Sequence, residues 1–131
     1  MSNVNMKAYK VEEIEFVGKI EGKAKLELQN KYSYNVKYTP ANICRGEFTV
    51  EVADKNTPEK FHIKAVIIGV FSFKEGIEKE FLHVETFNQL FPYVRSLVTT
   101  ITANCGIPPV IIPFTDIEGQ NIYRFEKNPG E

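Results

Sequence analysis

Residues 61–73, FHIKAVIIGVFSF, carry the pattern that decides the fold. In the first half, apolar residues alternate with the polar His62 and Lys64, which predicts a strand with one buried and one exposed face. In the second half, from Val66 to Phe71, the positions on both faces are apolar. A strand of this kind must be covered on both faces. One helix is too narrow to do so, and the pattern therefore predicts a buried interface with another copy of the chain.

Three further strands are predicted before this one. Residues 32–38 and 47–52 each alternate apolar and polar side chains with a period of two. Turn residues follow the first run at Pro40 and the second run at 56–58. Residues 9–20 are less regular, because Val11 and Ile14 are out of phase, and a bulge near Glu12 accounts for the change. Since the links between the four strands are short, we expect an antiparallel meander.

After Gly76 the period changes from two to that of a helix. An amphipathic stripe predicts a helix over about 89–104, with Asn88 as its N-cap, Pro92 in its first turn and Gly106 just beyond its end. The stripe consists of Leu90, Val94, Leu97, Val98 and Ile101. Residues 75–87 fit either a short helix or an irregular connection. The predicted fold class is α+β, a four-stranded antiparallel sheet with one long helix.

Residues 107–114, IPPVIIPF, form a proline-rich apolar loop after the helix. Three prolines restrict the backbone and remove hydrogen-bond donors, which excludes a helix or a central strand. Five of the eight residues are nevertheless large hydrophobes: Ile107, Val110, Ile111, Ile112 and Phe114. The loop therefore either fills the chain's own core or presents a stiff apolar surface to a partner.

Length and composition restrict the classes of protein that remain. The 131 residues are enough for one domain, 1–131, in which we expect residues 1–8 and 126–131 to be flexible. A hydrophobic content of 43% excludes a disordered chain, and a net charge of −1 gives no general attraction to nucleic acid or anionic lipid. With no secretory signal and no apolar run long enough to cross a bilayer, we expect a soluble cytoplasmic protein whose Cys44 and Cys105 are reduced.

The residues of known catalytic and metal-binding motifs are absent from the sequence. It contains no nucleotide-binding glycine loop, no nucleophile elbow and no paired cysteine motif. His62 and His83 are the two histidines, and neither has a second ligand at a spacing suited to zinc. The carboxylates Glu12, Glu13 and Glu15 fit a solvated strand face better than a catalytic pair. We therefore expect no enzyme activity, no metal and no cofactor.

Three segments together resemble the protein-export chaperone SecB. They are the strand motif GVFSF at 69–73 followed by GIE at 76–78, the helix motif LFPYVR at 90–95, and the loop 107–114, in the same order and spacing as in that family. The resemblance is close over about residues 60–117 and extends to 9–53 only as a pattern of strands.

The resemblance implies a holdase, a chaperone that binds unfolded polypeptides without ATP and assembles as a dimer or a dimer of dimers. Its clients would be preproteins or one dedicated client, such as the antitoxin of a toxin–antitoxin pair. The client groove would be lined by Phe71, Phe73, Ile107, Val110, Ile111, Ile112 and Phe114. Phe91, Tyr93 and Arg95 would be structural or subunit-packing residues.

The family also implies a second partner and leaves one alternative open. An acidic sheet face contacts the SecA motor in this family, and Glu12, Glu13, Glu15 and Glu27 would take its place here. The alternative is an oligomeric binding protein for a single ligand or partner, in which the proline loop closes a fixed pocket. The breadth of the clients distinguishes these two hypotheses.

Overall fold

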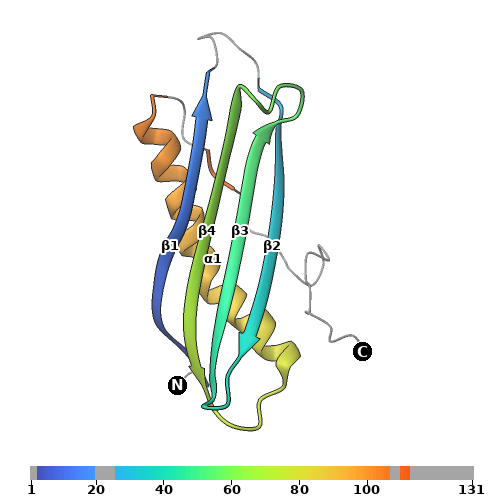
Figure 1. Ribbon diagram of the computed structural model, residues 1–131, viewed down its shortest axis with the longest axis vertical. Coiled ribbons are helices and arrows are strands. Elements are labelled where there is room, and N and C mark those ends of the chain that lie inside the picture. Colours follow the sequence, from blue (N-terminus) through green and yellow to red (C-terminus); the bar gives the residue numbers. More distant parts are fainter. Residues whose placement is uncertain (1–2, 20–25, 107–109, 113–131) are drawn as a thin grey trace.

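The protein is an antiparallel sheet with one long helix across it (Figure 1). The computed structural model describes residues 3–19, 26–106 and 110–112. They form β1 (Val4–Gly18), β2 (Leu28–Tyr38), β3 (Ile43–Asp54), β4 (Phe61–Phe73) and α1 (Lys79–Asn104). We call the side of the sheet that α1 covers the helix face and the other side the open face. The predicted α+β class and four-stranded antiparallel sheet are confirmed.

The strand order in the sheet is β1-β4-β3-β2. Strands β2, β3 and β4 follow one another as the expected meander, but β1 pairs with β4 and not with β2. This arrangement places β4, the most apolar strand, between two neighbours. Both edges of β4 therefore pair with another strand, β1 on one side and β3 on the other.

Strand β1 is irregular in the way its sequence predicts. Its pairing with β4 shifts register between Val11 and Glu13, which places a bulge at Glu12, and shifts again between Met6 and Ala8. The bulge at Glu12 brings Val11 and Ile14 opposite Ile67 and Ala65, so that both lie on the helix face. Of the segment 1–8, which was expected to be flexible, residues 4–8 belong to β1 in the structure. Residues 126–131 lie outside the described residues.

Helix α1 begins ten residues before the predicted start. It runs from Lys79, Glu78 occupies the N-cap position, and Pro92 lies inside it. The early turns were missed because His83 and Thr86 occupy buried positions in an otherwise apolar stripe. The end was predicted correctly, since Gly106 follows the helix with a φ of +80°. Among the described residues, no helix combines the length and the apolar character that crossing a membrane requires.

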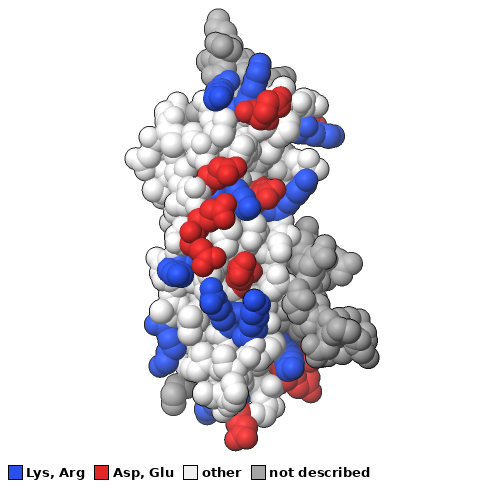
Figure 2. Space-filling view, viewed as in Figure 1, with Lys and Arg blue, Asp and Glu red and all other residues white. Residues whose placement is uncertain are grey.

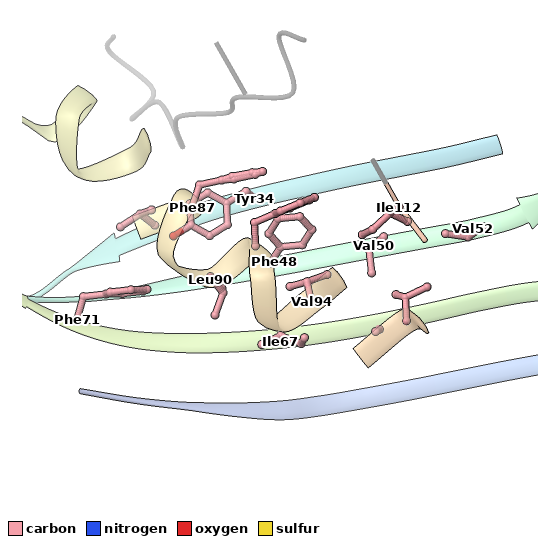
Figure 3. Packing of buried hydrophobic residues seen from close by; sticks show 14 of the residues in the cluster. Tyr34, Phe48, Val50, Val52, Ile67, Phe71, Phe87, Leu90, Val94 and Ile112 are labelled. Atoms are coloured by element: carbon pink, nitrogen blue, oxygen red, sulfur yellow. The ribbon is translucent and has the colours of Figure 1, made fainter. Parts of the chain in front are cut away.

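The core lies between the helix face and α1, and aromatic rings dominate its centre (Figure 3). The ring centroids of Phe48 and Phe87 are 5.0 Å apart, and Tyr34 packs against both rings. The Tyr34 hydroxyl donates a 2.6 Å hydrogen bond to Thr86 Oγ1, which in turn donates to the carbonyl of Leu82. Gly46 leaves room for this arrangement, because a Cβ there would overlap the Tyr34 hydroxyl. The hydrogen bond satisfies a buried hydroxyl without opening the core.

On the open face, side chains of the neighbouring strands shield the apolar residues of β4. Val66 and Ile68 point to this face and are only 7% and 3% exposed, although no second layer built from the described residues covers them. Their cross-strand neighbours are long or charged, with Glu13 opposite Val66 and Lys10 opposite Ile68. Such side chains lay their aliphatic stems over apolar neighbours and keep their charges in water. Side chains of the same sheet therefore already shield the apolar half of β4 on this face.

Candidate functional site

The predicted client-binding residues that the structure describes do not form one continuous surface. Phe71 and Ile112 are both fully buried and lie far apart in the labelled core (Figure 3). Phe73 follows at the end of β4 and is partly buried against the same core. Ile107 and Phe114 lie outside the described residues. In the described part of the chain, Phe71 and Ile112 are core residues, because a client cannot reach a side chain without exposed surface.

The segment Val110–Ile112 does both things that were expected of the loop as alternatives: it fills part of the core and presents an apolar side chain to solvent. The Thr99 hydroxyl donates a 2.9 Å hydrogen bond to the Val110 carbonyl, and the Val110 N–H donates a 2.7 Å bond to Thr102 Oγ1. Ile112 enters the core near Val50 and Val52 (Figure 3). Ile111 lies between these two anchored neighbours and is 61% exposed. One isoleucine therefore fills the core while the adjacent one is presented to solvent.

A second exposed apolar surface runs along the sheet edge beside α1. Tyr9 of β1 and Tyr93 of α1 bring their ring centroids to 4.6 Å. Val11 and Ile14 lie on the same side of β1, and the four side chains are 38% to 49% exposed. We call these four residues the β1–α1 strip. The resemblance assigns a structural or subunit-packing role to Tyr93. The β1 residues were not predicted, and the phase change at Glu12 was the signal that could have found them.

The acidic residues of β1 lie over the open face and contact basic side chains there (Figure 2). A carboxylate oxygen of Glu12 lies 3.7 Å from an Arg45 guanidinium nitrogen and 3.9 Å from the Lys10 ammonium. Glu13 and Lys64 form a pair at 3.7 Å. Across the sheet, charges alternate in sign in one row of cross-strand neighbours: Glu15, Lys64, Glu51 and Lys31. The open face is therefore balanced in charge rather than acidic.

His62 links β4 to β1 through a charged hydrogen bond. Its Nε2 lies 2.7 Å from Glu15 Oε1, and its Nδ1 lies 3.0 Å from the Pro58 carbonyl. Both partners are acceptors, so only the doubly protonated ring can donate to both. The hydrogen bond to Glu15, followed by the one to Pro58, raises the pKa of His62 above its usual value. The arrangement stabilises the pairing of β1 with β4.

The fourth predicted acidic residue, Glu27, has a separate position. Its backbone N–H donates a 2.8 Å bond to Asp54, and its carboxylate lies 3.8 Å from the Lys55 ammonium. Asp54 also accepts hydrogen bonds from the N–H and the hydroxyl of Thr57, and the hydroxyl bond lowers the pKa of its carboxyl group. Glu27 is therefore part of the connection around Asp54 and does not join the carboxylates of β1.

The open face also contains a polar pocket of about 380 Å³. Its lining includes side chains of both signs, among them Glu15, Lys31, Glu51 and Lys64. Such a lining does not favour an apolar polypeptide segment, because the charged groups would lose hydration without gaining partners. Among the described residues, no group of three or more acidic, histidine or cysteine side chains is placed to hold a metal ion. The apolar surfaces on the helix side remain as the candidate binding surfaces.

Comparisons with known proteins support the same family as the motifs. A protein of Methanocaldococcus jannaschii is 41% identical over 61 residues, which are 44% of this chain and 39% of that protein. The protein-export protein SecB of Anaplasma marginale is 34% identical over 79 residues, which are 55% of this chain and 45% of SecB. The chain thus spans less than half the length of these relatives. No protein-family profile matches it.

A solved structure shares the fold. It is the SecB-like chaperone Rv1957 of Mycobacterium tuberculosis in complex with a ChAD peptide from the antitoxin HigA1. The match has a TM-score of 0.70 at 12% identity and covers 87% of this chain and 91% of the other. This likeness shows the fold, a four-stranded antiparallel sheet with one long helix. Over somewhat more than half of its own length, the chain is also similar in sequence to SecB proteins.

Proposed function

We propose that the chain is an ATP-independent holdase that binds unfolded polypeptides, either preproteins or a dedicated client such as an antitoxin. The SecB relatives and the fold shared with an antitoxin-binding chaperone support a binding protein of this kind rather than an enzyme. The observation that carries the proposal is the exposure of Ile111 on a segment whose neighbours are held by the helix and the core. We propose Val110, Ile111 and the half-buried Phe73 as the client contacts among the described residues.

The chemistry of this surface suits clients of varied sequence. Burying one aliphatic side chain contributes about 1.5–3 kcal/mol, and the contribution depends on area rather than on direction. A few such contacts only partly exceed the cost of ordering an unfolded chain. The resulting binding is reversible and discriminates weakly among apolar segments, as a holdase requires.

The proposal is tested by Ile111→Asp in an assay of aggregation suppression without ATP. We expect the wild-type chain to suppress aggregation of two unrelated denatured proteins, citrate synthase and rhodanese, and Ile111→Asp to weaken this effect about tenfold or more. Ile112 is unsuitable for the test, because a charge there would disrupt the core. Phe81→Ser is the matched control, since Phe81 is 52% exposed near the start of α1.

The outcomes separate the holdase from its alternative. Equal suppression by wild type, Ile111→Asp and Phe81→Ser would contradict the assignment of the client surface. Suppression by the wild type for one client and not for the other would favour a dedicated binding protein. The far-ultraviolet circular dichroism of both variants should match the wild type, because both substitutions are at exposed positions.

We further propose that the β1–α1 strip packs against a second copy of the chain. The strip is apolar, lies at a sheet edge and is held in place by the contact between Tyr9 and Tyr93. Exposed edges and apolar patches of this kind are typical of interfaces between subunits. Light scattering should give a mass of at least twice 15.0 kDa, and Ile14→Lys should return it to that of one chain. A wild-type monomer at micromolar concentration would contradict this assembly.

We do not include SecA in the proposal. Three of the acidic residues expected to contact it, Glu12, Glu13 and Glu15, already contact basic side chains of the open face. A basic partner would have to displace those contacts and would gain little net attraction from a balanced surface.

A further inference from the structure

The described part of the proline loop is attached to α1 through a single backbone residue. The carbonyl and the N–H of Val110 both bond to threonine hydroxyls of the helix, at 2.9 Å from Thr99 and 2.7 Å from Thr102. Thr99 and Thr102 are three residues apart, so both face the same side of α1. One helix turn therefore satisfies both backbone polar groups of Val110.

The hydroxyl of Thr102 is well suited to its part in this attachment. Thr102 is fully buried, and its hydroxyl donates back to the carbonyls of Val98 and Thr99 at 3.0 Å. Its hydrogen is therefore directed into the helix, and a lone pair remains to accept the N–H of Val110. The buried Ile112 fixes the segment on the other side of Ile111. Ile111 is thus held from both directions while its own side chain stays in solvent.

We infer that Thr99 and Thr102 are positioning residues that hold Ile111 in the conformation in which it binds clients. This inference rests on the proposed function. An anchor that is already ordered loses less conformational entropy on binding than one on a free segment. Removing either hydroxyl should release the segment and weaken client binding even though neither threonine contacts the client.

The variants are Thr99→Val and Thr102→Val, which keep the side-chain shape and remove the hydroxyl. Thr100→Val is the matched control, because Thr100 is exposed and lies between them on another side of α1. The first readout is hydrogen exchange of the Val110 amide. We expect exchange at least fivefold faster in Thr102→Val and unchanged in Thr100→Val, since the loss of one hydrogen bond corresponds to about this factor.

The second readout is the affinity for reduced, carboxymethylated α-lactalbumin, a permanently unfolded probe. We expect Thr99→Val and Thr102→Val each to weaken binding about threefold to tenfold. The same substitutions in an Ile111→Ser background should cause no further loss, because they act through Ile111. A general structural defect would weaken binding equally in both backgrounds.

The results distinguish the inference from the proposed function. If Ile111→Ser weakens binding and the threonine variants do not, the positioning role is overturned and the holdase stands. If Ile111→Ser binds the probe as the wild type does, the client surface is wrong, and the positioning role is overturned with it even if exchange at Val110 becomes faster. Unchanged exchange in Thr102→Val would also overturn the inference.

Discussion

The two faces of the sheet are both covered, but by different physical means. On the helix face, Phe48 is enclosed by rings from β2 and α1 and is fully buried. On the open face, Ile68 is almost as well buried, and its neighbours on both adjacent strands, Lys10 and Glu47, end in charges. The first cover is rigid and close-packed, whereas the second is made of flexible stems at the surface. Burial of a side chain therefore does not by itself identify the core or predict a subunit interface.

The largest expected effect tests the difference in packing between the two faces. Phe48→Ala should lower the free energy of unfolding by about 3–5 kcal/mol, because the rings around it cannot close the cavity. Ile68→Ala should lower it by about 1–2 kcal/mol, because the charged stems above it can rearrange. Urea denaturation of the two variants measures both values. Equal losses would show that the open face is packed as rigidly as the core.

The next effect comes from His83, which is buried on α1 against Tyr34. Burial lowers the pKa of His83 to about 4, so the unfolded chain binds a proton at a higher pH than the folded chain does. The free energy of unfolding should therefore fall as the pH falls from 6.5 through about 4. This histidine accounts for about 3 kcal/mol of that loss. Denaturation at pH 7 and pH 4.5 measures most of this loss, and no decrease would contradict the burial of a neutral ring.

The smallest effect comes from His62 on the open face and has the opposite sign. Because its pKa is raised, its bond to Glu15 is fully present below pH 6.5 and is lost as the pH rises through the folded-state pKa. The bond is near the surface, and Glu15→Gln should lower the free energy of unfolding by less than about 1 kcal/mol at pH 6. NMR titration of the two histidines should show His62 titrating above 6.5 and His83 near 4. Coincident titrations would remove the distinction between the faces.

The sequence predicted the parts of the fold that depend on local periodicity. Alternation located β2, β3 and β4, the phase change located the bulge at Glu12, and Gly106 marked the end of α1. The first turns of α1 were not predicted, because His83 and Thr86 interrupt the apolar stripe and are accommodated only by contacts with Tyr34. Polar residues in a core depend on partners that local sequence does not reveal.

The sequence predicted which residue types make up the candidate site but not which of them are exposed. The sequence by itself determined that an apolar loop follows the helix and that prolines prevent it from forming a regular element. Only the tertiary structure decided that Ile112 is buried, that Ile111 is exposed and that β1 joins β4. Periodicity depends on neighbouring residues, whereas these outcomes depend on hydrogen bonds and contacts between residues far apart in the chain. That is why one sequence pattern was compatible with both a core plug and a binding surface.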